Sequence, residues 1–302
     1  MDVIRFEKLE GWRPVRPTYG VVGWPVAHTL SPPMHAAAMS ALGIDADYLA
    51  FEVRPEDLRG ALDILQKAGV LGLNLTVPHK ALAVGLVDEL SDEARQVGVA
   101  NTLVFGEGGR RTGHNTDARG FGRAIREDFR IPLSELKVLI LGAGGAGRAI
   151  ALQAARDRAE RIVIANRTEA RAEALARDIA PIFLGDKLEG QAARLRAVRL
   201  DTDVLAREVD GVDLVVNATS VGMRPGDPSP LAPHLIRPHH LVYDTIYSPP
   251  RTPLLEAATE MGARGVNGLS MLLHQGALSL ELWLGRSAPV EVMRRALRRA
   301  AG

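Results

Sequence analysis

A glycine-rich stretch of this chain has the spacing of a loop that binds a dinucleotide. Residues 142–147 read Gly-Ala-Gly-Gly-Ala-Gly, which matches G-x-G-x-x-G. In that pattern, backbone N–H groups and the N-terminus of the following helix approach a pyrophosphate. The flanks fit this mechanism: an apolar run at 137–141 precedes the loop, and an alanine-rich helical segment at 148–158 and a second apolar run at 161–165 follow it. This order of strand, helix and strand predicts a dinucleotide site.

The residues at the end of the second apolar run indicate which dinucleotide would bind. An NAD site usually has Asp or Glu about 20 residues after the glycine loop, where the carboxylate holds the ribose 2′-hydroxyl. Here Asn166 and Arg167 occupy that place, and Arg171 follows one helical turn later. A guanidinium binds a 2′-phosphate through paired hydrogen bonds, whereas a carboxylate would repel it. We therefore expect NADP; the alternative is that Thr168 only caps the next helix and Arg167 is solvated.

A lysine after the apolar run at 70–75 is a candidate for proton transfer. The run predicts a strand whose end presents Asn74 and Thr76, and Pro78 is expected to open a helix. Lys80 would then lie in the first turn of that helix, where the positive end of the helix dipole disfavours a cation and eases the loss of its proton. A lysine that simply faces solvent is the alternative.

Two hydroxyl groups lie at the start of another predicted helix. Ser31 is followed by Pro32 and Pro33, and this order predicts a helix that begins near Ser31 and stops at Gly43. The hydroxyls of Thr29 and Ser31 could bind a carboxylate beside the helix N-terminus. Helix capping by Ser31 would explain that residue equally well.

A predicted hairpin between residues 99 and 117 brings two more polar side chains to loop ends. Asn101 lies on its first segment, the turn is at 106–109, and the returning segment ends at Asp117. A helix is expected at 118–128. Asp117 is therefore either a functional carboxylate or the N-cap of that helix.

The later segments complete the elements that hold these residues. A buried strand is predicted at 212–216, and the small polar residues after it stand where open α/β sheets bind ligands. Further apolar runs complete an open sheet. From Gly268 onward two long helices, at 270–284 and 290–300, replace the strands. We expect these helices to return to the first domain.

The whole pattern predicts an α/β fold of two domains. One is an α/β substrate-binding domain with a mostly parallel sheet, formed by residues 1–116 and 268–302. The other is a Rossmann-like, doubly wound NADP-binding domain at 117–267. The active site would lie in the cleft between them. Residues 1–17 are expected to form a loose arm, and residues 181–196 a loop or insertion.

The composition argues against several classes of protein. The chain has 302 residues with 37 basic and 36 acidic side chains, so no charge excess would attract nucleic acid or an anionic membrane. It contains no cysteine, and its 8 histidines show no metal-ligand spacing. No apolar run reaches about 18 residues and no signal-peptide pattern is present, which predicts a soluble, cytoplasmic protein. The arginines at 294–299 fit the exposed face of a last helix.

Several short motifs occur in an order that resembles the shikimate dehydrogenase family. The resemblance extends from about Tyr19 to the C-terminal helices, and the ordered set is more specific than any one motif. The motifs are Gly23-x-Pro25-x-x-His28-Thr29-x-Ser31-Pro32, Asn74-x-Thr76-Val77-Pro78-x-Lys80, Ala100-Asn101-Thr102, Asn115-Thr116-Asp117, the glycine loop, Asn166-Arg167-Thr168, Asn217-Ala218-Thr219-Ser220 and Gly268-x-x-Met271-Leu272-x-x-Gln275.

The resemblance implies a reaction and a role for each site residue. A family member would reduce 3-dehydroshikimate to shikimate with NADPH, in the pathway to the aromatic amino acids. By resemblance, Lys80 and Asp117 are the acid–base pair. The implied substrate-binding residues are Thr29, Ser31, Asn74, Thr76, Lys80, Asn101, Asp117, Tyr247 and Gln275. The implied cofactor-binding residues are Gly142, Ala143, Gly144, Gly145, Ala146, Gly147, Asn166, Arg167, Thr168, Arg171, Ala218, Thr219, Ser220, Met223, Thr245 and Gly268.

The chain departs from the family pattern at one of the carboxylate-binding positions. Thr29 stands where the family usually has serine, so the hydroxyl is kept and a methyl group is added. A related dehydrogenase that acts on quinate or an aminoshikimate therefore stays open as an alternative. A nonenzymatic nucleotide-sensing protein of the same fold is another, although it would be expected to have lost Lys80 or Asp117. The expected partner is a small-molecule substrate, and the protein would be a monomer or a homodimer.

Overall fold

The computed structural model describes residues 3–185 and 194–302. The chain divides into two compact units, each with its own sheet. Unit 1 comprises Met1–Thr116 and Leu272–Gly302, and unit 2 comprises Asp117–Met271. Within the described residues, no helix combines the length and the apolar character needed to cross a membrane.

Unit 1 is built on a seven-stranded, mostly parallel sheet. Its strands are β1 (Val3–Arg5), β2 (Thr18–Gly23), β3 (Asp47–Glu52), β4 (Val70–Leu75), β5 (Glu89–Leu90), β6 (Thr102–Phe105) and β7 (Arg111–His114). They follow the order β1-β3-β2-β4-β6-β7-β5. β1 to β4 are parallel, β6 pairs antiparallel with β4, and β7 returns beside β6 as the predicted hairpin.

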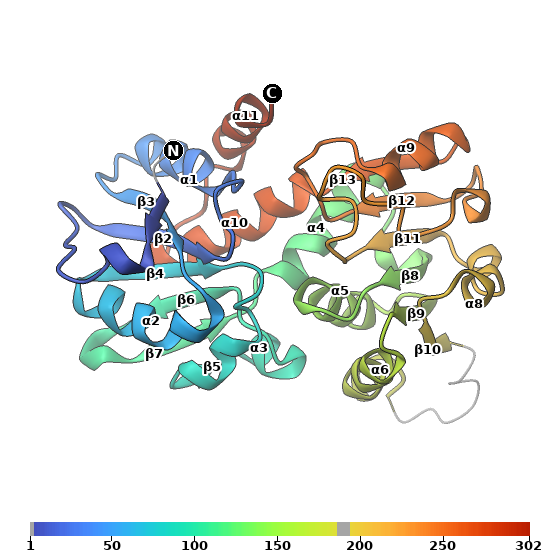
Figure 1. Ribbon diagram of the computed structural model, residues 1–302, viewed down its shortest axis with the longest axis horizontal. Coiled ribbons are helices and arrows are strands. Elements are labelled where there is room, and N and C mark those ends of the chain that lie inside the picture. The colour runs from blue at the N-terminus through green and yellow to red at the C-terminus, as the bar shows by residue number, and fades with distance from the viewer. Residues whose placement is uncertain (1–2, 186–193) are drawn as a thin grey trace. The chain divides into compact units, whose positions relative to one another are not determined.

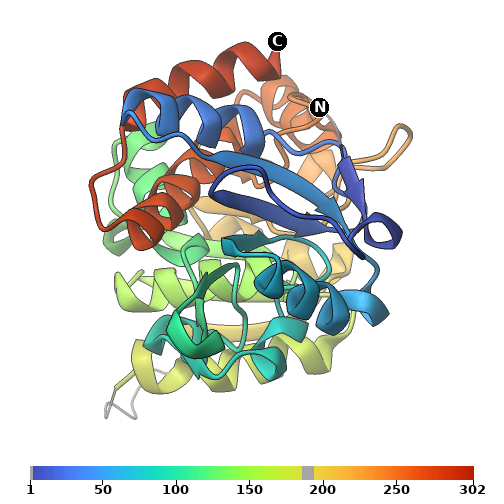
Figure 2. The ribbon, with the colours of Figure 1, turned by 90° about the vertical axis from the view of Figure 1, so that its left-hand side faces the viewer.

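Helices cover both faces of the sheet of unit 1, as Figures 1 and 2 show. Leu62 of α2 (Leu58–Lys67) and Leu73 of β4 belong to one apolar cluster on one face of the sheet. On the opposite face, a Cβ added to Gly72 would lie 2.2 Å from Nε1 of Trp283. Because successive strand residues point to opposite faces, Asn74 shares the face of Gly72. The helices of this unit are α1 (Ser31–Ala41), α2 (Leu58–Lys67), α3 (Asp92–Val97), α10 (Leu269–Leu284) and α11 (Val290–Ala301).

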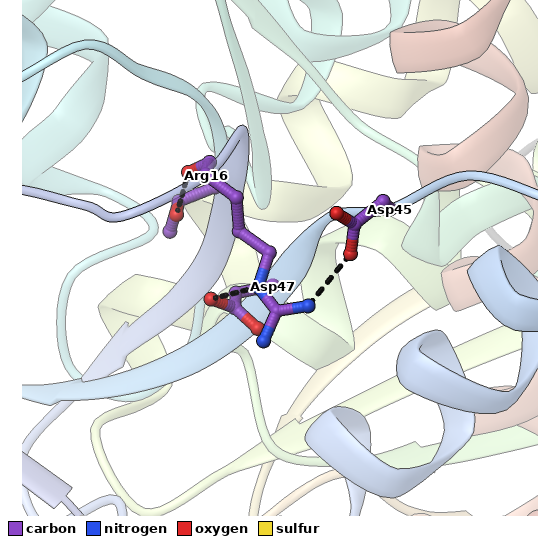
Figure 3. A network of polar contacts seen from close by, with 4 residues as sticks. Arg16, Asp45 and Asp47 are labelled. Carbon is purple, nitrogen blue, oxygen red and sulfur yellow. Dashed lines mark hydrogen bonds and ion pairs between the residues drawn. The ribbon is translucent and has the colours of Figure 1, made fainter.

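Residues 3–17 are anchored to this sheet, so the prediction of a loose arm was wrong. β1 pairs in parallel with the edge of β3, and Leu9 is fully buried. The guanidinium of Arg16 donates to Asp45 at 2.6 Å and to Asp47, the first residue of β3, at 3.1 Å (Figure 3). Phe6, Leu9 and Trp12, which pack in the apolar cluster of unit 1, recur at every third residue, a spacing that fits neither the alternation of a strand nor the period of an α-helix.

Unit 2 is a doubly wound sheet of six parallel strands. They are β8 (Lys137–Leu141), β9 (Arg161–Asn166), β10 (Leu195–Arg199), β11 (Leu214–Asn217), β12 (Leu241–Asp244) and β13 (Arg264–Asn267). Their order is β10-β9-β8-β11-β12-β13. Numbered along the unit this is 3-2-1-4-5-6, the order of the Rossmann fold, which confirms the predicted fold class. The order reverses between β8 and β11, and such sheets bind ligands beyond the carboxyl ends of the strands at this point.

Burial of both faces explains why the strands of unit 2 are continuously apolar. Val138 and Ile140 of β8 pack in one cluster, while Leu139 and Leu141 pack in another on the opposite face. The first cluster contains residues of α4 (Asp117–Phe129), α5 (Gly145–Arg156) and α6 (Glu169–Phe183). The second contains residues of α8 (Thr202–Ala206) and α9 (Pro253–Glu260).

No α-helix begins at Pro78, so the predicted position of Lys80 in a helical first turn was wrong. Residues 77–81 form turns, and a short 3-10 helix follows at Leu82–Leu86. The carbonyl of Lys80 accepts a hydrogen bond from the N–H of Ala100 at 2.9 Å, and this bond to another segment takes the place of helical bonding. The helix-dipole argument for Lys80 therefore does not apply.

One helix lies in a segment for which no element was predicted, and one predicted loop begins later than expected. The polar stretch at 91–96 contains α3, whose first turn is capped by the hydroxyl of Ser91, which accepts from the N–H of Ala94 at 3.2 Å. The loop predicted from Pro181 begins later, because α6 continues to Phe183. The rest of that predicted loop lies largely outside the described residues.

Candidate functional site

The turn that carries Lys80 is hydrogen-bonded to the end of β2 and to the residue that follows this strand. The N–H of Thr76 donates to the carbonyl of Val22 at 2.9 Å, and the N–H of Trp24 donates to the carbonyl of Val77 at 3.1 Å. With the bond from Ala100 at its far end, the turn is held from both sides. The half-buried side chain of Lys80 thus starts from a backbone that is fixed within unit 1.

The neighbour of Lys80, His79, points into the interior and anchors the turn. Its side chain is fully buried, and its Nε2 lies 2.8 Å from the carbonyl oxygen of Val53. Burial lowers the pKa of His79, so the ring stays neutral and Nε2 can donate to that carbonyl. The buried ring of His79 therefore fixes the backbone of the turn beside the half-buried Lys80.

The side chain of Asn101 links α10 to Thr116, the residue before Asp117. Its Oδ1 accepts from the N–H of Thr116 at 2.7 Å, and its Nδ2 donates to Oγ1 of Thr116 at 2.8 Å and to Oε1 of Gln275 at 3.3 Å. Thr116 leads directly into α4, whose first residue is Asp117. The buried amide of Asn101 therefore contacts the predicted site residue Gln275 directly, and it contacts Thr116, the neighbour of Asp117 in the chain.

Asn74 is more deeply engaged with the protein than its position near a strand end suggests. Only 5% of its surface is exposed. Its Oδ1 accepts a hydrogen bond from the hydroxyl of Tyr48 at 2.7 Å, and its Nδ2 donates to the hydroxyl of Ser279 at 2.9 Å. The structure places Asn74 within a buried polar network of unit 1.

Thr29 and Ser31 lie where the chain enters α1. Leu30 occupies the N-cap position without a side-chain hydrogen bond, and Ser31 is the first residue of the helix, so capping by Ser31 was a wrong alternative. The Oγ1 of Thr29 instead accepts from the N–H of Ser31 at 3.3 Å. Both side chains are buried, at 8% and 5% exposure. Their hydroxyls lie beside the first turn of α1, where an anion is favoured.

In unit 2, three glycines of the loop after β8 meet three different requirements. Gly142 has φ +108°, which favours glycine. A Cβ on Gly147 would lie 1.9 Å from the carbonyl oxygen of Gly142, so only glycine lets α5 start this close to the strand. At Gly144 a Cβ would meet no protein atom within 4 Å, which leaves that backbone open to a ligand. This is the division of roles that a pyrophosphate loop needs.

Asn166 fixes the end of β9 against this loop. Its Oδ1 accepts from the N–H of Ala143 at 3.1 Å, and its Nδ2 donates to the carbonyl of Thr168 at 2.8 Å. Arg167 and Arg171 are exposed beyond it. Thr168 occupies the N-cap position of α6, as the alternative reading expected, although its side chain makes no capping hydrogen bond.

The carboxyl ends of β11 and β12 carry a second buried network. Asp244 accepts from Nδ2 of Asn217 at 3.0 Å and from the hydroxyl of Thr252 at 2.7 Å. Burial raises the pKa of Asp244 to about 6. Next to it, a Cβ on Gly268 would lie 2.1 Å from the carbonyl oxygen of Thr245, so these two predicted cofactor residues are in close backbone contact.

The predicted site residues fall into two sets by unit. The substrate-side residues up to Asn101, together with Gln275, belong to unit 1, whereas Asp117, Tyr247 and the cofactor-side residues belong to unit 2. Sequence reasoning missed Tyr48 and Ser279. Ser279 had a signal: it is a polar residue four positions after Gln275 on an apolar helix face, where side chains are neighbours.

Family models match most of the chain. A model described as the shikimate dehydrogenase substrate binding domain matches residues 21–103, and one described as shikimate / quinate 5-dehydrogenase matches residues 125–221. A third, described as the shikimate 5'-dehydrogenase C-terminal domain, matches residues 268–298.

Known proteins are similar over nearly the whole length. A protein of Methanopyrus kandleri named shikimate dehydrogenase (NADP(+)) is 46% identical over 280 residues, which cover 92% of this chain and 93% of that protein. A crystal structure of shikimate dehydrogenase in complex with NADP+ has a TM-score of 0.85 at 35% identity and covers 95% of this chain and 96% of that one. The Thermus thermophilus enzyme in complex with NADP(H) and shikimate has a TM-score of 0.81 at 38% identity, with coverages of 94% and 100%.

Proposed function

This chain belongs to the shikimate dehydrogenase family, and we propose that it catalyses the reversible, NADP-dependent reduction of 3-dehydroshikimate to shikimate. The reaction is a step in the biosynthesis of aromatic amino acids. The observation that carries the proposal is similarity over nearly the full length to relatives of that name. The three glycine roles in the loop after β8 support the cofactor, because each fits a bound pyrophosphate.

Proton transfer is assigned to Lys80 and Asp117. The chemistry that the bound cofactor supplies is a hydride for the carbonyl carbon of the substrate. Nζ of Lys80 gives a proton to the oxygen that becomes the alcohol, and takes it back in the reverse direction. The carboxylate of Asp117 is the other member of the assigned acid–base pair. The hydrogen bonds at both ends of the turn and the buried side chain of His79 fix the backbone from which the Lys80 side chain extends.

The other residues of unit 1 are assigned to binding of the substrate. Thr29 and Ser31 hold its carboxylate with their hydroxyls at the first turn of α1. The ring hydroxyls contact polar side chains at the end of β4, directly after β4, directly before β6, on α10 and after β12. These are Asn74, Thr76, Asn101, Gln275 and Tyr247.

The cofactor residues are assigned to unit 2. The N–H groups at the start of α5 hold the pyrophosphate, and exposed Arg167 and Arg171 hold the 2′-phosphate. Thr245 and Gly268 line the nicotinamide side. Ala218, Thr219, Ser220 and Met223, after β11, complete this set.

The decisive experiment is a comparison of initial rates with shikimate and with quinate, each with NADP and with NAD. The wild-type protein is compared with Lys80→Met, which keeps the length of the side chain, and with Lys67→Met, which changes an exposed lysine at the end of α2. We expect shikimate with NADP to be the fastest pair. Lys80→Met should lose about 100-fold or more in kcat, as expected for loss of a general acid, whereas Lys67→Met should equal wild type.

The other outcomes separate the alternatives. Faster turnover of quinate would assign the chain to the quinate branch of the family and would point to the extra methyl group of Thr29. Faster turnover with NAD would contradict the role given to Arg167. No turnover with any pair, in a folded protein that binds NADP, would refute the enzymatic assignment.

A further inference from the structure

A buried network of hydroxyl and amide groups lies between the sheet of unit 1 and α10, with Ser279 at its centre. The side chain of Ser279 is fully buried, and its Oγ donates to the carbonyl of Gln275 at 3.0 Å. Nδ2 of Asn74 donates to this Oγ at 2.9 Å. Oγ1 of Thr102 and Oγ1 of Thr116 lie 2.8 and 3.1 Å from it. One hydroxyl thus contacts groups from three segments besides its own helix.

The amide of Asn74 is held in one orientation by this network. On one side the hydroxyl of Tyr48 donates to its Oδ1 at 2.7 Å. On the other, Nδ2 donates to Ser279 and also to the carbonyl of Asn101 at 3.2 Å. A carbonyl can only accept, so a reversed amide would place two oxygens against each other. Tyr48 and Ser279 therefore grip Asn74 from opposite ends, and we call this pair the Asn74 clamp.

The clamp also reaches the other groups assigned to the substrate. Ser279 holds the carbonyl of Gln275, one turn earlier on α10, while the side chain of Gln275 accepts from Asn101. Thr116, which Ser279 contacts, immediately precedes Asp117. Loss of a hydroxyl from this interior would leave its partners unsatisfied, and they would rotate to find new ones.

We propose that Tyr48 and Ser279 are positioning residues for the substrate, which act by fixing Asn74 and the Gln275 turn of α10. Neither residue is assigned a contact with the substrate. The proposal rests on the proposed function, because Asn74 and Gln275 bind shikimate only if that assignment holds. It predicts that the Michaelis constant for shikimate depends on two hydroxyls that sequence motifs do not include.

The chain offers a closely matched control for the clamp. Tyr19 of β2 stands directly opposite Tyr48 of β3 in the sheet, and both are 5% exposed. Both rings also pack near Trp283, with centroid distances of 5.0 Å for Tyr19 and 6.2 Å for Tyr48. Within the described part of the chain, no hydrogen bond of the Tyr19 hydroxyl is found. The substitutions Tyr48→Phe and Tyr19→Phe thus remove the same atom from equally buried sites that differ in the contact to Asn74.

The experiment measures kcat, the KM for shikimate, the KM for NADP and the melting temperature for wild type, Tyr48→Phe, Ser279→Ala and Tyr19→Phe. We expect the KM for shikimate to rise about fivefold in Tyr48→Phe, as for the loss of one neutral hydrogen bond, and about tenfold in Ser279→Ala, which loses more than one. The KM for NADP should change less than about twofold, because the cofactor residues lie in unit 2. Tyr19→Phe should match wild type in both constants.

Each other result has a definite meaning. If Tyr48→Phe and Ser279→Ala melt earlier but keep the wild-type KM for shikimate, the two residues are purely structural and the clamp is refuted. If Ser279→Ala does not fold, Tyr48→Phe decides alone, because it removes a single oxygen. A wild-type protein that does not oxidise shikimate would overturn the proposed function, and the clamp with it. Equal KM values in active wild type and variants would overturn the clamp alone.

Discussion

His35 should make unit 1 sensitive to acid. This histidine of α1 is fully buried, stacks on Tyr48 with 4.2 Å between ring centroids, and lies 5.6 Å from the ring of Trp283. Within the described residues, neither of its ring nitrogens has a hydrogen-bond partner. Burial lowers the pKa of His35 from 6.5 to about 3. The folded protein therefore holds the neutral ring at a pH where the unfolded chain binds a proton.

The sign and size of the effect follow from this difference in pKa. Between about pH 6.5 and about pH 3 the unfolded state binds one more proton than the folded state at this residue, so the free energy of unfolding falls as the pH falls. Each pH unit below 6.5 removes about 1.4 kcal/mol. At pH 5 the free energy of unfolding is therefore lower by about 2 kcal/mol because of His35. Above about pH 7 both states hold the neutral ring, and His35 causes no loss of stability.

The substitution His35→Phe isolates this contribution, because it keeps an aromatic ring against Tyr48 and removes the titrating group. Urea unfolding would be followed at pH 7.5 and pH 5.0 by tryptophan fluorescence. All 3 tryptophans of the chain lie in unit 1, so the signal reports on the unit that contains His35. Wild type should lose about 2 kcal/mol more than His35→Phe between the two pH values. His234→Gln, a change at an exposed histidine, should behave as wild type.

The refuting result is an equal loss of stability in wild type and His35→Phe, within about 0.5 kcal/mol. All other titrating groups are present in both proteins, so their contributions cancel in the comparison. Equality would mean that the folded protein accepts a proton on His35 near pH 6.5. The packing of a neutral ring between Tyr48 and α10 would then not describe the protein in solution.

Four further substitutions test three separate features of unit 2. Arg167→Ala should raise the KM for NADP about tenfold and leave that for NAD within about twofold, because it removes a charged hydrogen-bond donor to the 2′-phosphate; an equal change in both constants would contradict this role. Gly147→Ala should lower the melting temperature, because its Cβ would lie 1.9 Å from the carbonyl oxygen of Gly142. Gly144→Ala should keep the melting temperature of wild type, because its Cβ would meet no protein atom within 4 Å. It should instead weaken the binding of NADP, which calorimetry measures. Glu208→Gln should cost about 3 kcal/mol in urea unfolding, because this carboxylate is 2% exposed and lies 2.5 and 2.7 Å from two arginines; a cost below about 1 kcal/mol would show that the arginines rehydrate freely.

The interior of unit 2 was the most predictable part of the fold. The bounds of β8, at Lys137–Leu141, agree with the apolar run that predicted it, and β9, at Arg161–Asn166, extends its predicted run by one residue. A parallel strand buried on both faces is apolar at every position, and that signal is local in the sequence. The edge strand β1 and the helix α3 have no such signal, because short elements at the periphery depend on partners that are distant in the chain.

The Lys80 turn shows the same limit at the site. Pro78 is a residue that commonly opens a helix, and local rules stop there. The turn is instead held by two contacts with distant residues. The N–H of Ala100 donates to the carbonyl of Lys80, and buried His79 is hydrogen-bonded to the carbonyl of Val53. Lys80 could be selected from the sequence because an amine suits proton transfer. The conformation of its turn could not be predicted, because contacts with residues distant in the chain determine it.

Three asparagines of the motifs, together with Asn267, share a structural role that is separate from contact with a ligand. Asn74, Asn166, Asn217 and Asn267 each stand at or near the carboxyl end of a parallel strand. In each case Nδ2 donates to a backbone carbonyl: to Asn101, Thr168, Val221 and Pro250 respectively. For the three strands of unit 2, Oδ1 also accepts from a backbone N–H.

Such a bridge is needed where a strand leaves its sheet. The ladder of backbone hydrogen bonds stops there, and buried N–H and C=O groups still require partners. An asparagine side chain offers a donor and an acceptor at the distance of a peptide group, so it continues the ladder for one more step. Ligand loops begin at these same points in α/β sheets. A motif asparagine therefore first shapes the loop that binds the ligand, and its contact with the ligand, where it makes one, uses the capacity that remains.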